Sequence, residues 1–274
     1  MSFTLLPLWY QYSVVFIFGL IIGSFLNVVI YRLNTGRSLS GHSHCMSCGK
    51  TLHWYELVPL VSYLLQRGRC RGCSSLVPAR YFMCELLTGV VFLLTYQAIG
   101  DLLMVAISCI LFAVLIVTFF YDIDHLIIPD RMVIVTSVLA VGIVLAKTHE
   151  PMQLAMHAAA AIGAFSFFGG LWLVSKGRWI GLGDAKLAAP LAFILGPVGT
   201  FSFIVFSFWI GSVISLVVLG ILRLLQRGQQ YLRIHRFRFT MKSEVPFAPF
   251  IIASFLIVYL YAINAIELLQ RVFI

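Results

Sequence analysis

The sequence predicts an all-α polytopic membrane protein with about eight transmembrane helices. Three observations predict this fold class: 61% of the 274 residues are hydrophobic, only 11% are charged, and long apolar runs recur along most of the chain. A soluble domain is roughly half apolar and about a quarter charged, so this chain has more apolar surface than a water-exposed fold can bury. The composition therefore excludes a soluble enzyme, a disordered regulator and a fibrous protein.

The apolar runs give the number of spans, because a transmembrane helix needs about 20 mostly apolar residues. The first run, residues 12–31, has no basic residue ahead of it and no small-residue cleavage site behind it. We therefore expect an anchor and not a removed signal peptide. Residues 34–80 interrupt the pattern, and seven further runs follow them. These runs cover residues 84–99, 102–121, 132–147, 153–175, 185–197, 199–222 and 247–267. Of the eight spans in all, the sixth, residues 185–197, is short.

The basic residues indicate the orientation of these spans. Seventeen of the 19 Lys and Arg residues fall in odd-numbered connections, and only Lys147 and Arg271 fall on the other side. By the positive-inside rule the crowded side is cytoplasmic, so both termini are expected outside and residues 34–80 inside. The net charge of +9 is then explained by basic residues that gather in cytoplasmic loops, where they lie beside anionic lipid headgroups. We expect contact with membrane lipid and no nucleic-acid partner.

The segment 34–80 carries a metal-ligand pattern. Cys45-x2-Cys48 and Cys70-x2-Cys73 are two CxxC turns, and four thiolates in two short turns can close a tetrahedral shell around Zn²⁺. Two disulfides are the alternative, but disulfides are rare in the cytoplasm, where the topology places this loop. We predict a zinc-ribbon-like loop whose metal is structural, because four thiolates leave no open position for water.

Other side chains of the loop are open to more than one interpretation. Three histidines lie near the cysteines: His42, His44 and His53. Any of them could replace a cysteine as a metal ligand, although we expect all three to be solvated loop residues. The aromatic and apolar stretch 54–60 could lie on the membrane surface, but we expect it to pack on the zinc site. Cys84 and Cys109 fall within or beside spans and are expected to be packing residues.

The acidic residues gather at two helix ends. Asp122, Asp124 and Asp130 follow one span, and Asp184 stands in Gly181-Leu182-Gly183-Asp184-Ala185-Lys186 at the start of another. Carboxylates at such places are costly, so their default interpretation is functional. Two carboxylates close together can share one proton, so that one activates water and the other protonates a carbonyl. This is aspartic protease chemistry.

Three alternatives stay open from the residues alone. The acids could bind a coupling ion in a transporter, or they could simply reach water at helix ends, where an acid near an N-terminus is favourable. The chain could also be a zinc-bearing membrane scaffold without catalysis. The glycines favour the protease, since Gly181 and Gly183 let the backbone approach a second chain closely.

Taken together, these residues resemble the type IV prepilin leader peptidases, which also serve type II secretion. Five motifs occur in the family's order, and together they are far more specific than one GxGD. They are the stretch 23–33, the two CxxC turns with Trp54-Tyr55-Glu56-Leu57-Val58-Pro59, the stretch 122–130, the stretch 181–186, and Pro246-Phe247-Ala248-Pro249-Phe250. Two departures are Phe82, where proline is common, and Ala248, where we expect glycine.

The resemblance implies a function and a division of the chain. It implies an inner-membrane GxGD aspartyl protease that cleaves the basic leader of prepilins or pseudopilins after a glycine, at the cytoplasmic face. It also implies N-methylation of the new terminal residue with S-adenosylmethionine, whose binding residues the sequence does not indicate. The domains are then residues 1–33 as the first helix, 34–80 as the cytoplasmic zinc loop, and 81–274 as a seven-helix domain carrying the protease site.

The resemblance also assigns site residues. Asp122 and Asp184 would be the catalytic pair, with the supporting residues Asp124, Gly181, Gly183 and Lys186, and the zinc ligands would be Cys45, Cys48, Cys70 and Cys73. On a helix, Asp122 and Asp124 lie about 200° apart, so both cannot face one partner. The family's catalytic acid lies seven residues before a closing proline, and counting back from Pro129 gives Asp122. If the helix has already ended, this geometry decides nothing.

Overall fold

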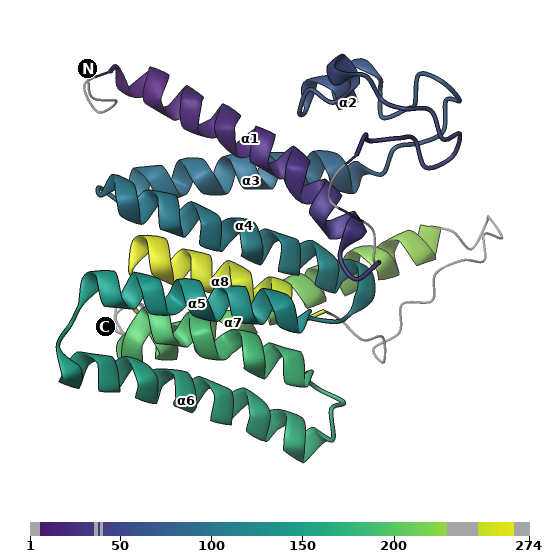
Figure 1. Cartoon of the computed structure of the whole chain (residues 1–274). Coiled ribbons are helices and arrows are strands. Elements are labelled where there is room, and N and C mark those ends of the chain that lie inside the picture. The colour runs from purple at the N-terminus through teal and green to yellow at the C-terminus, as the bar shows by residue number, and fades with distance from the viewer. Residues whose placement is uncertain (1–5, 36–37, 39–40, 229–245, 266–274) are drawn as a thin grey trace. The chain divides into compact units, whose positions relative to one another are not determined.

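The computed structural model describes residues 6–35, 38, 41–228 and 246–265 (Figure 1). Within these residues the secondary structure is helical, and pairing between extended segments is limited to two isolated bridges, both between residues 44 and 76. The chain divides into two compact units, Met1–Tyr121 and Asp122–Ile274. The predicted all-α polytopic fold is confirmed.

The described part of the chain contains eight apolar helical segments, in the order of the eight predicted runs. Five helices are long and apolar enough to cross a membrane: α1, α3, α4, α6 and α7. The non-helical residue Gly196 divides α7 into two segments. The apolar helices are α1 (Leu8–Arg32), α3 (Ala79–Ala98), α4 (Leu102–His125), α5 (Asp130–Lys147), α6 (Pro151–Ser175), α7 (Leu182–Gly228) and α8 (Ala248–Tyr261).

Several predicted boundaries need correction, and helix α1, for example, begins at Leu8 and not at residue 12. Helix α3 begins at Ala79, not at residue 84, because Pro78 starts the helix and the charged Arg80 in its first turn interrupts the apolar run. Helix α4 continues beyond residue 121 to His125. Helix α8 ends at Tyr261, where Ala262 adopts a left-handed conformation with φ of 48°, whereas the predicted run reached residue 267. Residues 266–267, the basic residues 233–242 and both chain ends lie outside the described residues.

In the first unit, α1 and α3 lie side by side and are held in contact by glycine (Figure 1). A Cβ atom at Gly19 would lie 2.8 Å from Gly89 Cα, and one at Gly23 would lie 2.8 Å from Glu85 Cα. No other residue tolerates such an approach, and small residues four apart are a common means of packing membrane helices. Since α1 precedes the cysteine-rich loop and α3 follows it, this packing holds the two ends of the loop together.

The loop itself has little regular structure. It contains the 3-10 helix η2 (Trp54–Glu56) and the short helix α2 (Val61–Leu65). Our expectation that the aromatic stretch packs on the zinc site is wrong for its largest member, because the Trp54 side chain is 79% exposed. Glu56 is the buried residue of this stretch, held by the Lys50 ammonium at 3.1 Å and by the backbone N–H of His53 at 3.0 Å. A polar bridge, and not aromatic packing, orders this part of the loop.

In the second unit, α7 packs against α5, α6 and α8 and is broken part-way. The break lies at Gly196, which has φ of 70°, and not at residue 198 as the apolar runs suggested. Pro197 has no N–H and so cannot bond the Phe193 carbonyl, and the His157 ring bonds that carbonyl instead. The His157 side chain thus replaces the hydrogen bond that the Phe193 carbonyl lacks at the break. Non-helical backbone inside a membrane requires such a partner.

Candidate active site and metal centre

Asp122 lies on the last turn of α4, and its side chain is buried. The residue is 5% exposed, whereas Asp124, two positions further on the same helix, is exposed. The helix continues to His125 and ends where Leu126 adopts a φ of 56°. The alternative in which the helix has already ended is therefore wrong, and the two acids do face different sides of α4.

Asp184 lies on the first turn of α7 and is 6% exposed. Its Oδ2 accepts a hydrogen bond of 3.0 Å from the backbone N–H of Gly181, just before the helix begins. An acid at the third helical position commonly reaches back to the N-terminal N–H in this way. The bond leaves the Asp184 side chain little freedom to turn, so the start of α7 fixes where its carboxyl group points.

The second unit brings these two acids together. The charge of Asp122 acts on the carboxyl group of Asp184, so the two groups are within electrostatic reach. Gly183 makes the approach possible, because a Cβ atom there would lie 3.1 Å from Ile128 Cβ in the turn that follows α4. The close contact predicted for the glycine motif is thus with another part of the same chain. Gly181 contributes its N–H to Asp184, as described above.

The surroundings of Asp122 leave one of its oxygens available. The backbone N–H of Ala248, at the start of α8, bonds the Asp122 carboxylate. Its Oδ2 is buried and accepts no hydrogen bond from the residues that the structure describes. A buried acceptor without a partner is costly, so this oxygen is suited to bind water or a substrate group.

Two further residues lie near these helix ends, Lys186 and Ala248, and Ala248 was not among the predicted site residues. Lys186, predicted as supporting, places its Nζ 2.8 Å from Asp130 Oδ1, and both side chains are exposed. Ala248 was named only as a departure from the family pattern, without a role. Its contact with Asp122 comes through the backbone, so its side-chain type gave no signal. The prolines at 246 and 249 were the available signal, because proline favours a helix start.

The four cysteines of the loop in the first unit form one cluster. Their Sγ atoms, from Cys45, Cys48, Cys70 and Cys73, all lie within 4.8 Å of one another. The Sγ atoms of Cys45 and Cys73 are 3.8 Å apart, and zinc–sulfur bonds of about 2.3 Å in a tetrahedron place sulfurs about 3.8 Å apart. The cysteines are not in disulfides. The donor set and its spacing fit a tetrahedral metal ion.

The two CxxC turns have the same backbone design. The N–H of Cys45 bonds the Lys50 carbonyl at 2.8 Å, and the N–H of Cys70 bonds the Ser75 carbonyl at 2.9 Å. Each turn closes through a left-handed residue directly after its second cysteine. These residues are Gly49, with φ of 70°, and Ser74, with φ of 56°. The backbone therefore presents both cysteine pairs in the same geometry before any ion binds.

Local hydrogen bonds favour a charged thiolate at Cys45 in particular, whereas at Cys48 the backbone hydrogen bond from Lys50 is outweighed by the neighbouring thiols and the pKa is raised to about 11. The backbone N–H groups of Cys48 and Ser47 lower the pKa of the Cys45 thiol to about 6, so the thiolate that binds metal is favoured. The His53 N–H, followed by the Lys50 ammonium, holds the pKa of Glu56 below its ordinary value. The cysteines are the whole of the ligand cluster in the described loop, and the His53 ring instead stacks on Tyr55.

Comparison with known proteins identifies the family. Residues 17–99 match the family model of the bacterial peptidase A24 N-terminal domain, and residues 109–216 match that of the type IV leader peptidase family. The chain belongs to the type IV leader peptidase family. It is thus a peptidase of this family and a multi-pass membrane protein.

Individual relatives have consistent names. A prepilin leader peptidase/N-methyltransferase of Myxococcus xanthus is 34% identical over 78% of this chain and 63% of its own length. A Bacillus subtilis protein of the same name is 29% identical over 93% of this chain and 96% of its own length. A third, from Neisseria gonorrhoeae, is 30% identical over 76% of this chain and 80% of its own length. No solved structure matches the chain significantly.

Proposed function

We propose that this leader peptidase removes the basic leader of type IV prepilins or type II secretion pseudopilins, after a glycine, and N-methylates the new terminal residue. The observation that carries the cleavage is the pair of buried carboxyl groups, Asp122 on α4 and Asp184 on α7, within electrostatic reach of each other. Family membership and the names of the relatives support the substrate class and the second activity.

The cleavage uses the two aspartates in different protonation states. Like charges this close do not both ionise easily, so the pair holds one proton between them. The ionised carboxylate takes a proton from water as the water attacks the scissile carbonyl, and the protonated one donates to the carbonyl oxygen. The resulting gem-diol then collapses and its C–N bond breaks, as the carboxyl group that took the proton gives it to the leaving amine and the other carboxylate takes a proton from a gem-diol hydroxyl. The unpartnered Oδ2 of Asp122 is the oxygen that can accept from the water. The Gly181 and Ala248 N–H groups hold the two carboxyl groups in place.

The orientation follows from the distribution of charge. We place the zinc loop and the aspartates on the cytoplasmic side of the bacterial inner membrane and both termini outside, because Lys and Arg concentrate in the odd-numbered connections. A prepilin has a basic leader in the cytoplasm followed by an apolar helix in the bilayer. Its scissile bond then lies at the membrane surface, the level at which α4 ends and α7 begins.

The four cysteines hold a structural Zn²⁺ in this proposal. Cys45, Cys48, Cys70 and Cys73 satisfy all four tetrahedral positions, so no site remains for a catalytic water. Such an ion stabilises the fold of the loop, because its binding free energy is part of the folding free energy.

Methyl transfer is the second activity and uses S-adenosylmethionine as donor. The donor supplies a methyl group on a positively charged sulfur, which a neutral amine displaces. Because this donor is a charged cytoplasmic metabolite, its site belongs on the cytoplasmic side, near the zinc loop and the adjoining helix ends.

Two other functions remain as outcomes of the test. In a transporter, coupling acids are expected near the membrane midplane between broken helices. Here Asp122 and Asp184 lie on the last and first turns of their helices, and the break in α7 at Gly196 is elsewhere. A zinc-bearing scaffold would keep its function when either aspartate is replaced.

The experiment incubates the purified full-length protein in detergent with a prepilin and methyl-labelled S-adenosylmethionine. Intact mass and sequencing of the product should show loss of the leader after glycine and one added methyl group at the new N-terminus. A prepilin with its glycine replaced by alanine is the control and should be cut poorly. Uncut prepilin would reject the peptidase, and a cut but unlabelled product would reject only the methyl transfer.

A further inference from the structure

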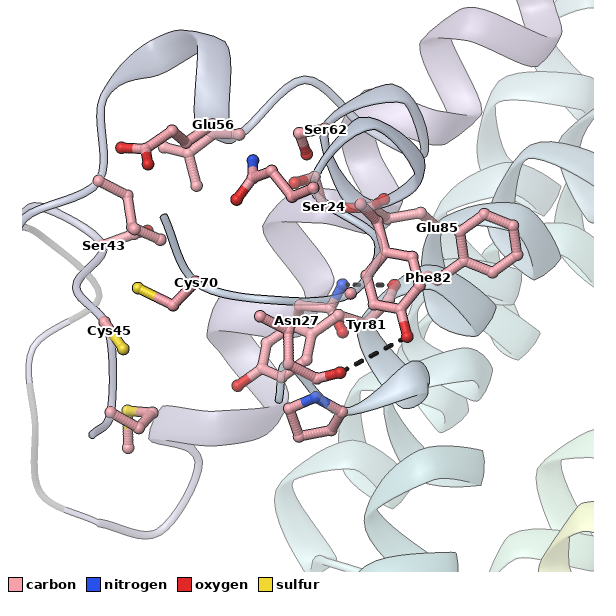
Figure 2. Close-up of a pocket in the computed structure, with 18 of the residues that line it drawn as sticks. Ser24, Asn27, Ser43, Cys45, Glu56, Ser62, Cys70, Tyr81, Phe82 and Glu85 are labelled. Atoms are coloured by element: carbon pink, nitrogen blue, oxygen red, sulfur yellow. Dashed lines mark hydrogen bonds between the residues drawn. The ribbon is translucent and has the colours of Figure 1, made fainter. Parts of the chain in front are cut away.

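A partly open cavity of about 720 Å³ lies within the first unit, bordered by the cysteine-rich loop and by the ends of α1 and α3 that adjoin it (Figure 2). Its size is in the range of about 300–1,000 Å³ that small-molecule sites occupy. Side chains from all three segments line it, including Ser24 and Asn27 of α1, Ser62 of the loop and Glu85 of α3. The cleavage mechanism uses none of these residues.

Glu85 is a buried acid in the wall of this cavity. The residue is 9% exposed, and its Oε2 accepts a hydrogen bond of 2.8 Å from the backbone N–H of Leu60. The Ser24 hydroxyl also hydrogen-bonds the carboxyl group. Both partners are neutral, and no cationic side chain of the described residues pairs with Glu85. A buried carboxylate without an opposite charge is unfavourable, so this wall favours a cationic ligand.

Asn27 provides a second unused acceptor. It is 4% exposed, and its Nδ2 donates a hydrogen bond of 3.1 Å to the Tyr81 carbonyl, as Figure 2 shows. That bond fixes the orientation of the amide, and the Oδ1 atom then has no partner among the described residues. Since Asn27 lines the cavity, a ligand with an N–H or O–H group can satisfy this buried oxygen.

The remaining walls combine aromatic rings with positive charge. Tyr63 and Phe82 lie with ring centroids 5.4 Å apart, and Tyr81 adds a third ring. Arg32 and Arg69 also line the cavity. The walls therefore offer an anionic group, cationic groups, an uncharged acceptor and flat apolar surfaces within one space.

This combination matches one compound in the proposed reaction. S-adenosylmethionine carries a sulfonium, an ammonium, a carboxylate and a flat adenine with N–H donors. We propose that this cavity binds S-adenosylmethionine, with Glu85 facing the sulfonium and Asn27 Oδ1 accepting from an N–H group of the ligand. This inference rests on the methyl transfer proposed above and deepens it by assigning the donor site.

The chemistry balances without a further reactant. The neutral amine of the new N-terminus attacks the methyl carbon, and the carbon–sulfur bond breaks with its electron pair on sulfur. The products are S-adenosylhomocysteine and an N-methylammonium, whose proton is released to water. The positive charge leaves the sulfur in this step, so a carboxylate facing the sulfur binds the donor more strongly than the product.

A purely structural role for Glu85 is the rival explanation. Its bond to Leu60 anchors the loop to α3, and Leu60 has a φ of 59°, which is unusual for leucine. The substitution Glu85→Gln separates the two roles, because glutamine keeps an oxygen that accepts the Leu60 N–H but carries no charge. Loss of an anchor would weaken binding of the donor and of S-adenosylhomocysteine equally, whereas loss of the charge affects mainly the donor.

The test measures binding directly. Equilibrium dialysis of the full-length protein in detergent gives the Kd of labelled S-adenosylmethionine and of S-adenosylhomocysteine, and prepilin cleavage is measured in the same preparations. We expect Glu85→Gln to raise the Kd of S-adenosylmethionine about tenfold or more and that of S-adenosylhomocysteine much less. Asp101→Asn, which removes an exposed charge from the same unit, is the matched control and should change neither Kd.

A second pair of variants tests the cavity by volume. Ser62→Phe places a ring in the cavity and should abolish binding of both ligands while cleavage continues. Leu64→Phe, on the exposed side of the same short helix, should bind both ligands normally. If the unaltered protein binds and transfers methyl but Glu85→Gln and Ser62→Phe bind normally, the site is elsewhere and the proposed function stands. If the unaltered protein neither binds nor transfers methyl, both proposals for methylation fail and the peptidase is unaffected.

Discussion

The cysteine cluster and the aspartate pair are built in opposite ways. Each cysteine pair lies in a short segment, residues 45–50 or 70–75, whose backbone hydrogen bonds lie within that segment. Asp122 and Asp184 come from two different helices and meet only because the Gly183 region packs closely on Ile128. Each half of the cysteine cluster is therefore set by local sequence, and the aspartate pair by tertiary packing. A change that perturbs helix packing should affect cleavage and leave the metal in place.

The largest expected effect is on cleavage, when either aspartate of the pair is replaced and the cysteine cluster is left intact. Asp122→Asn and Asp184→Asn should lower the rate of prepilin cleavage by about 10³-fold or more, because asparagine keeps size and polarity but cannot share the proton. Zinc content, measured by metal analysis, should not change. Asp124→Asn is the matched control and should retain cleavage, since its side chain is exposed. An active Asp122→Asn protein beside an inactive Asp124→Asn protein would reverse the assignment.

The second effect is the converse experiment on the metal centre. Cys45→Ser and Cys70→Ser should each lose the one zinc equivalent per chain and lower the Tm, because three thiolates hold the ion weakly and its binding free energy is lost. Elemental analysis with a thermal melt checks both quantities. Cys84→Ser is the control for a cysteine outside the cluster, and it should keep its zinc. Retention of a full equivalent in both cluster variants would refute the predicted ligand set.

The third effect tests the packing that joins the aspartates. Gly183→Ala adds a methyl group at 3.1 Å from Ile128 Cβ, so the start of α7 must shift. A displacement of a catalytic group by a fraction of an ångström is costly, and we expect kcat to fall about 10–100-fold with zinc content unchanged. Gly163→Ala on α6, where a Cβ atom meets open space, should have normal kcat. Equal kcat for the two variants would show that the close approach is not needed.

The smallest effect concerns the exposed ion pair at the same helix ends. Lys186→Met removes the 2.8 Å contact with Asp130. Surface pairs contribute little, so the free energy of unfolding should change by less than about 1 kcal/mol, and the KM and kcat for prepilin by no more than a few-fold. Asp130→Asn, which changes the other partner of the ion pair, should alter the free energy of unfolding, KM and kcat equally little. A large loss of kcat in Lys186→Met alone would instead place the Lys186 ammonium in contact with substrate.

The sequence predicts the helices well and their ends poorly. Apolar runs located all eight helical segments, because membrane insertion depends on summed hydropathy. Hydropathy does not report backbone hydrogen bonding, and so it missed the first turn of α3 at Ala79 and the left-handed end of α8 at Ala262. It also missed the position of the break in α7. The backbone there depends on Pro197 and on His157, a side chain from another helix.

The site residues also divide into those that the sequence predicted and those that it did not. The cysteine spacing alone predicted a cluster, and the structure shows one. Helical periodicity separated Asp122 from Asp124, but only the resemblance to the family, and no local pattern, paired Asp122 with Asp184. The Ala248 contact was not predictable from residue type, because a backbone N–H makes it. The cavity bounded by Asn27 and Glu85 was also hidden, since it exists only when the loop folds back on α1 and α3.

The glycine contacts between α1 and α3 have a consequence for the folding of the metal loop. A chain segment with free ends loses entropy when its ends are brought together, by roughly (3/2)RT ln n for n residues. Here Gly19, Gly23 and Gly89 join the helices before and after the loop, so the membrane-embedded pair has already closed it. A disulfide gives a small secreted domain the same advantage but needs an oxidising compartment. The packed helix pair holds the two ends of the loop together as a disulfide would, and reducing conditions do not break it.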